Sequence, residues 1–440
     1  MKIRRLKIKN YKVFDDVEFD FTDKDGNTLD TIVLAGVNGS GKTTLLKLIG
    51  DVFSNKLENY SVPSMISELF SCEKVEMVLE IHTSFIESIH GEAIADKILS
   101  LKNEITGFYK FTFDKHSGKN DFYHFLKLSS QNKLPEPSVF RCYFIPSETY
   151  INDDKYFFSQ NNSYKNNPKE DLEAKINQQD NALLRKLDFQ IHKNIIEKYV
   201  IEDVLEDILQ NRNRPANDII EKKIENYNKV LSGINVNTKI KDISTNQVIF
   251  KTVNKEQVKI EDLSSGEKHL YYRGIYLHHL NIKNSIILVD EPEDSLHPSW
   301  QSRMAKFYNN IGKNNQVFLA THSPHIIASV KPESLFLLAI NEETQKVEVI
   351  NMGKTDQPTK GLEPNRVLQE IMGLESLRDV ETQEKIDELR TLLTPEKFDS
   401  IEAKALIEEL TLDLGRKDPY IMRLQNQLLL LERKRKKQTA

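Results

Sequence analysis

Apolar and polar positions alternate along residues 2–11 and 15–21, and this alternation predicts two β-strands at the start of the chain. The run at 31–36 is apolar without alternation, which is typical of a buried strand. From residue 42 the apolar side chains recur at helical spacing. We therefore expect strand, strand, loop and helix over the first 50 residues.

Residues 72–146 contain further strand-like runs, at 75–82, 108–113, 123–128 and 140–146. They predict a mainly antiparallel lobe that covers the first sheet. Residues 165–233 differ, because they are rich in Asn, Lys, Glu and Gln and show helical spacing at 194–209. Since no heptad repeat is sustained there, we expect a compact helical insert and no long coiled coil.

Strand-like runs return after residue 233 and alternate with helices, which predicts a second α/β lobe. The runs are 238–243, 248–253, 257–263, 285–290 and 317–323, with helices from about residue 266 and after Pro298. After about residue 355 the pattern is wholly helical. The predicted segments are 1–164, 165–233, 234–350 and 351–440.

Composition and charge restrict the class of protein. Lys plus Arg is 61 against 66 Asp plus Glu, a formal net charge of −5, so any nucleic-acid contact must come from a local patch. Only Cys72 and Cys142 are present, which argues against a disulfide framework or a zinc site. No apolar run approaches the roughly 18 to 20 residues of a membrane helix, and the start lacks a secretory pattern. We expect a cytoplasmic protein without membrane contact.

A phosphate-binding loop is the most specific pattern in the chain. Residues 36–43 fit G-x-x-x-x-G-K-[ST] between a predicted buried strand and a helix. Glycines let backbone N–H groups surround phosphate oxygens, Lys42 reaches the terminal phosphates, and Thr43 offers a hydroxyl to Mg²⁺. The alternative is a glycine-rich turn that happens to precede a helix. The candidate nucleotide-binding residues here are Gly36, Asn38, Gly39, Ser40, Gly41, Lys42, Thr43 and Thr44.

Two acidic residues follow one another at the end of the predicted strand 285–290. Asp290 lies at the carboxyl edge, where open α/β sheets bind their ligands, and is expected to hold the magnesium shell. Glu291 is positioned to accept a proton from the attacking water if it lies near the terminal phosphate. By themselves these residues would better suit a strand that ends in solvated carboxylates, which is common.

The sequence LSSGE at 263–267 gives those carboxylates a context, since its Ser264 lies 26 residues before Asp290 (290 minus 264). Ser264 and Glu267 form a capping box, and Ser265 and Gly266 allow a phosphate to approach the helix N-terminus. A plain helix cap is the alternative. Because the first loop already encloses its own nucleotide, we expect the second helix end to take a phosphate from a partner subunit.

A histidine, His322, follows the next strand and could donate to the terminal phosphate or to the water. The alternative is a solvated loop histidine. Its position after LSSGE and Asp290 favours the functional interpretation.

Together these motifs resemble the ABC-type ATPase heads over about the first 340 residues. The 248 residues between Lys42 and Asp290 (290 minus 42), together with Asn10 to Lys12 and the run 290–298, are similar to the branch of SMC, RecF and OLD ATPases. The resemblance implies an α/β P-loop ATPase head of two lobes with a helical insert and a C-terminal all-helical extension. It also implies ATP and Mg²⁺ as ligands.

The same resemblance implies a role for each motif. Thr43 and Asp290 would bind the metal, and Glu291 and His322 would be catalytic. Residues 264–267 would belong to the nucleotide site, with Ser265 and Gly266 acting on the nucleotide of a second copy.

The chain departs from the family pattern in several places. His297 stands where transport ATPases carry an aspartate, and no glutamine is assigned to the glutamine loop, for which Gln160 is a guess outside the site. Long coiled-coil arms are absent, which argues against a chromosome-organising or double-strand-break protein. The tail lacks the spaced acidic cluster of the nuclease domain that follows OLD-type heads, so we expect that this chain cuts nothing itself.

A narrower resemblance is to the ATPase subunit family (PtuA) of the bacterial Septu antiphage systems, which also serves in certain retrons. It rests on the head size, the modest insert and the tail runs 361–373 and 414–428. It implies a homodimer or larger homo-oligomer that binds a separate HNH endonuclease and controls DNA cleavage through nucleotide state. The alternatives are a RecF-like repair ATPase without a nuclease partner and a transporter's cytosolic engine, which the opening strands and the insert disfavour.

The tail is assigned to oligomerisation or partner docking. Its last helix is expected to begin with Asp418 as N-cap and Pro419 at the first position, with one apolar face made of Ile421, Leu424, Leu428 and Leu431. This face indicates packing, within or between subunits. The basic run 433–437 would bind DNA phosphates or, as is more common, solvate the end of the chain.

Overall fold

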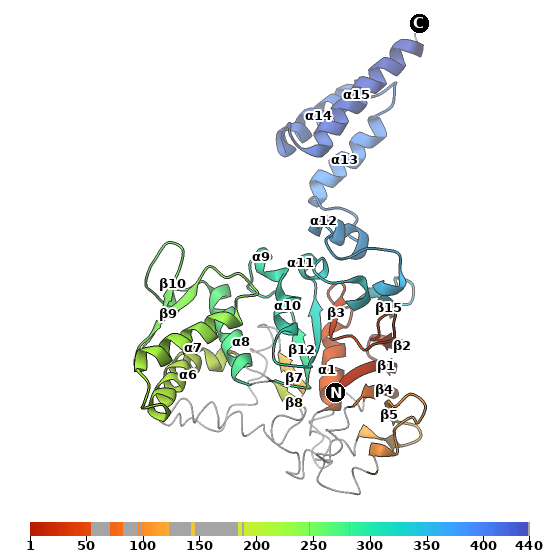
Figure 1. Ribbon diagram of the computed structural model, residues 1–440. Helices are drawn as coiled ribbons and strands as arrows, with labels where there is room; N and C mark the ends of the chain where they lie inside the picture. Colours follow the sequence, from red (N-terminus) through yellow and green to blue (C-terminus); the bar gives the residue numbers. More distant parts are fainter. Residues whose placement is uncertain are drawn as a thin grey trace. The chain divides into compact units, whose positions relative to one another are not determined.

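The computed structural model of the 440-residue chain describes residues 1–53, 71–81, 96, 98–122, 142–145, 184–186, 189–245, 247–280 and 282–438. The chain divides into two compact units, Met1–Val367 and Leu368–Ala440 (Figure 1). The division lies after the predicted boundary at 350, because the intervening residues bond to the first unit. Thr359 Oγ1 donates to Val330 O, and Gly361 N donates to Ala328 O.

A sheet of seven described strands, in the order β15-β14-β3-β13-β12-β7-β8, forms the centre of the first unit. Its neighbouring strands run parallel, except β14 and β15. β12 and β13 are buried at every position, as strands of a parallel sheet covered on both faces are expected to be. The strands are β3 Thr31–Ala35, β7 Cys142–Ile145, β8 Leu184–Lys186, β12 Ile286–Asp290, β13 Gln316–Thr321, β14 Leu335–Ile340 and β15 Val347–Asn351.

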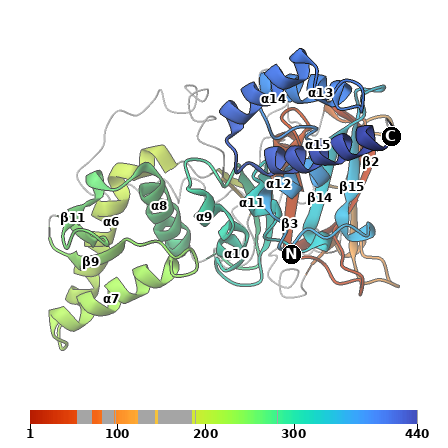
Figure 2. The same cartoon turned by 90° about the horizontal axis from the view of Figure 1, so that it is seen from above.

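An antiparallel sheet in the order β2-β1-β4-β5-β6 shares one apolar core with the central sheet and with α1, Lys42–Val52. Phe21 joins the two sheets, since its ring centroid lies 5.2 Å from those of both Phe318 and Phe336. β2 and β15 lie side by side (Figure 2). The strands are β1 Lys2–Tyr11, β2 Phe14–Asp20, β4 Lys74–Glu80, β5 Tyr109–Asp114 and β6 Lys119–Asn120.

The strand predicted at 140–146 does not belong to the antiparallel lobe, and that expectation is wrong. Its described part, β7, pairs in parallel with β12, so that Cys142 lies opposite Ile286. All four residues of β7 are buried, which a sheet covered on both faces provides and a half-exposed antiparallel sheet does not. The strands predicted at 75–82 and 108–113 are confirmed as β4 and β5. The run at 123–128 lies outside the described residues.

A smaller α/β region of the first unit carries α8, Ser265–His279 (Figure 2). α8 contacts α6, Phe189–Gln210, and α7, Ala216–Val230, which are the two helices in the described part of the predicted insert. The insert is not entirely helical, because β8 joins the central sheet. The small antiparallel sheet β11-β10-β9 consists of β9 Lys239–Ile243, β10 Val248–Lys251 and β11 Val258–Lys259, and β11 is followed by η4 Ile260–Asp262.

Short helices connect the later strands of the central sheet, namely α9 Pro298–Gln301, α10 Met304–Asn309, α11 Pro324–Ile327 and η5 Pro332–Ser334. Two more, η6 Met352–Lys354 and α12 Pro364–Arg366, follow the last strand, β15. No helix in the part of the chain that the structure describes is both long and apolar enough to cross a membrane.

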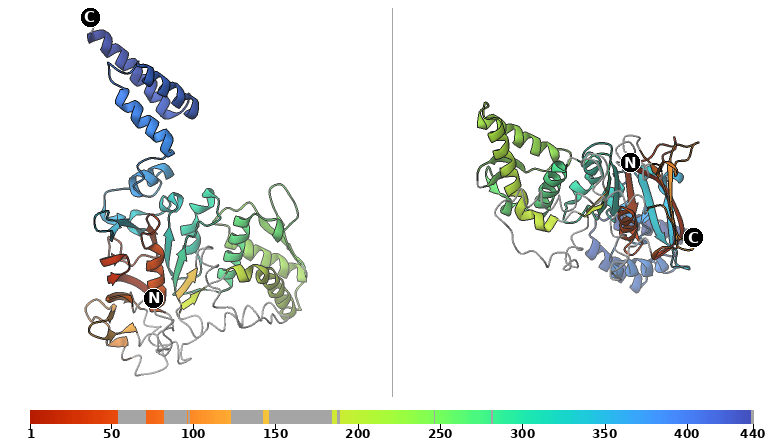
Figure 3. Two further views of the ribbon diagram at one scale, coloured as in Figure 1. Left: turned by 180° about the vertical axis from the view of Figure 1, so that it is seen from behind. Right: turned by 90° about the horizontal axis from the view of Figure 1, so that it is seen from below.

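Three helices of the second unit pack around one apolar core (Figure 3). They are α13 Val380–Leu392, α14 Ile401–Leu414 and α15 Pro419–Gln438, and the π-helical turn η7 Val367–Ile371 precedes them. Asp418 Oδ1 accepts a hydrogen bond from Tyr420 N at 2.8 Å, which confirms the predicted start of the last helix. Its predicted apolar face is also confirmed, since Ile421, Leu424 and Leu431 are buried and Leu428 packs against the core.

Candidate functional site

The phosphate-binding loop connects β3 to α1 at the carboxyl edge of the central sheet. Gly39 and Gly41 have φ angles of 81° and 92°, a left-handed conformation that favours glycine. At Gly36 a Cβ would lie 2.5 Å from the backbone oxygen of Leu338. The loop therefore requires glycine for two different reasons, backbone conformation at Gly39 and Gly41 and space at Gly36.

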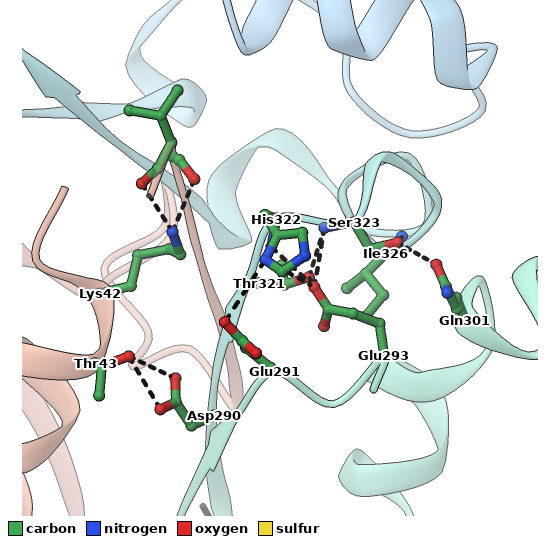
Figure 4. Close-up of polar contacts among 12 residues, drawn as sticks. Lys42, Thr43, Asp290, Glu291, Glu293, Gln301, Thr321, His322, Ser323 and Ile326 are labelled. Atoms are coloured by element: carbon green, nitrogen blue, oxygen red, sulfur yellow. Dashed lines mark hydrogen bonds and ion pairs between the residues drawn. The ribbon is translucent and has the colours of Figure 1, made fainter. Parts of the chain in front are cut away.

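Lys42 is folded back onto this loop. Its Nζ donates to Gly36 O at 2.8 Å and to Val37 O at 3.0 Å (Figure 4). Burial lowers the pKa of Lys42, and the negative charges of Glu291 and Asp290 oppose that shift. An ammonium group held by carbonyl oxygens and facing two carboxylates can transfer its hydrogen bonds to phosphate oxygens.

Ser40 supplies a further polar group inside the loop. Its hydroxyl is fully buried and has no hydrogen-bond partner among the residues that the structure describes. A buried unpaired hydroxyl is unfavourable unless a ligand satisfies it. Together with the glycines and Lys42, it makes the loop fit a bound nucleotide phosphate.

Thr43 and Asp290 contact each other directly. Thr43 Oγ1 donates to the two carboxylate oxygens of Asp290, at 2.9 and 3.0 Å. The pKa of Asp290 is raised to about 6, chiefly by burial. The hydrogen bond from Thr43 lowers the pKa and so opposes this shift, whereas the negative charge of Glu291 adds to it. A hydroxyl and a carboxylate fit Mg²⁺, which prefers oxygen ligands and binds through one or two protein groups plus phosphate and water.

Glu291 and His322 approach each other from the ends of adjacent strands. His322 Nδ1 lies 3.8 Å from Glu291 Oε1, and both side chains are partly exposed (Figure 4). Glu291 has a left-handed backbone with φ of 46°, and its N–H donates to Ala320 O at 2.9 Å. Burial and then the charge of Asp294 raise the pKa of Glu291, while His322 opposes the shift. A carboxylate with a raised pKa suits a general base.

The LSSGE segment forms the predicted capping box at the start of α8. Ser264 N and Oγ donate to Glu267 Oε2 at 3.1 and 2.7 Å, and Glu267 N donates to Ser264 Oγ at 3.3 Å. Ser264 and Ser265 are exposed. Gly266 is buried, and a Cβ there would lie 2.7 Å from Ser295 O. This glycine therefore allows α8 to pack against the segment that follows Asp290.

The predicted site residues fall into two groups within the first unit. Lys42, Thr43, Asp290, Glu291 and His322 converge at the carboxyl edge of the central sheet (Figure 4). The residues 264–267 begin α8, which packs on α6 and α7, whereas α1 packs on β12 and β13 (Figure 1). Among the described residues, α8 makes no extensive contact with α1, the helix that follows the phosphate-binding loop.

Two residues that had no predicted role are central to the observed site, Glu293 and Gln301. Glu293 accepts hydrogen bonds from residues 321–323, and Gln301 Oε1 accepts one from Ser323 Oγ at 2.7 Å. Glu293 stands in the acidic run after Asp290, but its partners depend on which strand is the neighbour of β12. No local pattern in the sequence indicates that neighbour.

Of the two positions discussed as departures from the family pattern, the structure describes His297 and does not describe Gln160. His297 caps α9, because its Nδ1 accepts a hydrogen bond from Ser299 N at 3.2 Å. Gln160 lies outside the described residues, so the glutamine loop stays unassigned.

Comparison with known proteins adds evidence of a different kind. A family model described as AAA ATPase domain matches residues 1–327. The retron Vc95 probable ATPase of Vibrio cholerae serotype O1 biovar El Tor is 22% identical over 412 residues, covering 80% of this chain and 76% of that protein. The Septu protein PtuA of Bacillus thuringiensis is 24% identical over 363 residues, covering 77% and 78%. The predicted resemblance to Septu and retron ATPases is confirmed.

Solved structures of SMC heads are also similar. The SMC head domain from Thermotoga maritima has a TM-score of 0.39 at 12% identity, covering 80% of this chain and 99% of that chain. The SmcHead bound to the C-winged helix domain of ScpA has a TM-score of 0.44 at 13% identity, with the same two coverages.

Proposed function

Because the chain belongs to the AAA ATPase domain family, we propose that it hydrolyses ATP with Mg²⁺ at sites shared between two copies. The family match also confirms the predicted fold class. One observation carries this proposal. Lys42, Asp290, Glu291 and their neighbours gather at one sheet edge, while the exposed Ser264 and Ser265 begin a helix in another region of the same unit. A second copy would supply the nucleotide that this helix end binds.

In this proposal Lys42 exchanges the backbone oxygens of Gly36 and Val37 for oxygens of the terminal phosphates. Thr43 and Asp290 would hold Mg²⁺, which would neutralise the negative charge on the phosphate oxygens. The backbone N–H groups at the start of the second copy's α8 donate to the phosphate from the opposite side.

Glu291 accepts the proton of the attacking water in the proposed reaction. Burial raises its pKa, so the carboxylate binds that proton more readily than an exposed one does. His322 faces Glu291 and donates to the terminal phosphate or to the water. The water oxygen attacks the terminal phosphorus, and the bond to the ADP oxygen breaks.

We further propose that this ATPase belongs to a cytoplasmic antiphage complex and that closure of the ATP-bound dimer controls a separate HNH endonuclease. The chain would then contact DNA directly or through the nuclease. The similarity to Septu protein PtuA and to the retron Vc95 probable ATPase supports this. The second unit exposes large apolar side chains that another chain can cover, at Ile401, Leu412, Met422, Leu429 and Leu430.

Mixing two inactive variants tests the shared site. Lys42→Ala removes the phosphate contact of its own subunit, and Ser265→Arg blocks the surface offered to the partner, so each variant alone should not hydrolyse ATP. A mixed dimer keeps one intact site. At most one of the two sites in each dimer can then be intact, so hydrolysis should return in the mixture to no more than about half of wild type. Activity of Ser265→Arg alone, or none in the mixture, would contradict the shared site.

Purification of the tagged chain from cells that express its native operon tests the nuclease partner. Mass spectrometry should detect an HNH endonuclease in stoichiometric amount, and ATP should alter DNA cleavage by the purified complex. Recovery of the chain alone, or with recombination proteins, would instead favour a repair ATPase.

A further inference from the structure

Glu293 is a buried carboxylate that joins two segments of the site. Its side chain is 6% exposed, and a single oxygen, Oε1, accepts three hydrogen bonds (Figure 4). The donors are Thr321 Oγ1 at 2.6 Å, His322 N at 2.9 Å and Ser323 N at 3.1 Å. Three consecutive residues at the end of β13 are therefore held by one oxygen atom.

The segment that carries Glu293 also carries Glu291. Asp294 N donates to Glu291 O at 3.1 Å, and Leu296 N donates to Glu293 O at 2.9 Å, so two consecutive turns follow β12. One end of this folded segment presents Glu291 to the nucleotide site, and the Glu293 side chain binds the loop that presents His322. Nδ1 of His322 lies 3.7 Å from Glu293 Oε1 and 3.8 Å from Glu291 Oε1.

A second connection holds the same loop. Ser323 Oγ donates to Gln301 Oε1 at 2.7 Å, and Gln301 Nε2 donates to Leu296 O at 2.9 Å. The loop after β13, the segment after β12 and the end of α9 thus form a closed ring of hydrogen bonds. The Glu293 carboxylate binds the backbone N–H of His322, whereas Gln301 binds the hydroxyl of Ser323, one residue further on.

The arrangement is unfavourable for stability alone. Burial of a carboxylate requires compensating hydrogen bonds, yet the second oxygen, Oε2, has no partner among the residues that the structure describes. The bonds that are made come from the backbone N–H of His322 and from its two neighbours, Thr321 and Ser323. The position of that side chain relative to Glu291 depends on them.

We infer that Glu293 is a positioning residue for ATP hydrolysis, which binds the Thr321 hydroxyl and the backbone of residues 322 and 323 so that His322 stays opposite Glu291. This inference rests on the proposed function of the site. Glu293 is buried and its hydrogen bonds go to residues 321–323, so in this inference it acts through His322. Its loss should lower kcat for ATP and leave nucleotide affinity nearly unchanged, because Lys42, Thr43 and Asp290 keep their contacts.

The test compares two substitutions at this position in the full chain. Glu293→Ala removes the acceptor, and a displaced catalytic group should reduce kcat by about 10- to 100-fold. Glu293→Gln keeps an oxygen where Oε1 accepts the three bonds, and it should restore kcat to within about threefold of wild type. ATP binding, measured by equilibrium titration, should change less than about threefold in both. The kcat and KM of each variant give the decisive comparison.

Asp121 offers a matched control, because it is a buried carboxylate that also accepts a backbone hydrogen bond, from Thr112 N at 3.0 Å, far from this site in the antiparallel sheet. Asp121→Ala should lower thermal stability and leave kcat unchanged. If Glu293→Ala fails to fold, Thr321→Val removes only one of the three bonds and should lower kcat by a smaller factor.

Three results would overturn the inference and one would separate it from the proposed function. Glu293→Ala with wild-type kcat, Glu293→Gln as inactive as Glu293→Ala, or an equal loss in Asp121→Ala would each contradict positioning by Glu293. Absence of ATP hydrolysis by wild type, with ATP still bound, would instead overturn the proposed reaction and with it any part for Glu293.

Discussion

Thr43 Oγ1 lies 2.9 Å from Asp290 Oδ1, although 247 residues separate them along the chain. Thr43 follows β3 and Asp290 ends β12, with β13 between the two strands. Because these strands run parallel, their carboxyl ends meet at one edge of the sheet. The order of the strands therefore assembles the proposed magnesium site.

Glu291→Gln should reduce ATP hydrolysis by about 100- to 10,000-fold, the range that a general base contributes. The amide cannot take the proton from water, but it keeps the size of the side chain, so ATP should still close the dimer. Light scattering after size-exclusion chromatography with Mg²⁺ and ATP measures this closure. Lys42→Ala is the control and should stay monomeric. If Glu291→Gln with ATP is as monomeric as the nucleotide-free protein, the shared site is wrong.

Gly36→Ala should destabilise the chain more than Gly39→Ala. At Gly39 the φ of 81° lies in the left-handed region, where a residue other than glycine costs about 1 to 2 kcal/mol. At Gly36 the φ is 150°, which residues with a side chain also rarely adopt. At Gly36 the new methyl group also meets Leu338 O at 2.5 Å, while nothing lies within 4 Å at Gly39. The clash should add about 1 to 3 kcal/mol. Chemical denaturation of both variants checks the difference, and equal losses would contradict the packing described at Gly36.

Gly266→Ala and Ser265→Ala should separate structure from function in the LSSGE segment. A methyl group at Gly266 would lie 2.7 Å from Ser295 O, so the free energy of unfolding should fall by about 1 to 3 kcal/mol. Ser265 is exposed, and its substitution should change stability by less than about 0.5 kcal/mol while lowering hydrolysis. Thermal unfolding and ATP turnover of both variants are the measurements. A stable Gly266→Ala would show that α8 has room to move.

Asp418→Ala should lower the free energy of local unfolding of α15 by about 1 to 2 kcal/mol at neutral pH, the usual contribution of an N-cap residue. Burial raises the pKa of Asp418, but hydrogen bonds from Arg378 and from Tyr420 N outweigh it and lower the pKa overall. Because the folded-state pKa lies below the unfolded value of about 3.9, the carboxylate stabilises the fold above that pH and ceases to do so as pH falls through the folded pKa.

Hydrogen exchange of α15 amides measures this difference. The gap between wild type and Asp418→Ala should be full at pH 7 and should shrink below about pH 4. Asp418→Asn keeps the accepting oxygen without the charge and should lie between the two at neutral pH. A gap that does not depend on pH would show that the ionised form of Asp418 contributes nothing.

Much of the local structure was predictable because it depends on neighbours in the sequence. The opening strands and α1 follow from the apolar spacing of residues 2–50, and Asp418 with Pro419 marks the start of α15. The phosphate-binding loop is also local, since consecutive residues supply both the glycine conformations and Lys42. The capping box of Ser264 and Glu267 depends on residues three positions apart.

Only the tertiary structure decided which of these segments meet. The sequence of β7 predicted another antiparallel strand like its neighbours along the chain, yet β7 is buried at every position and pairs in parallel with β12. Gly266 suggested a phosphate contact, and the structure adds a close approach to Ser295 O. Glu293 was one acid among several until β13 placed three donors around its oxygen. Periodicity and motifs report contacts within a few residues, whereas these contacts arise from strand order, which the local pattern does not contain.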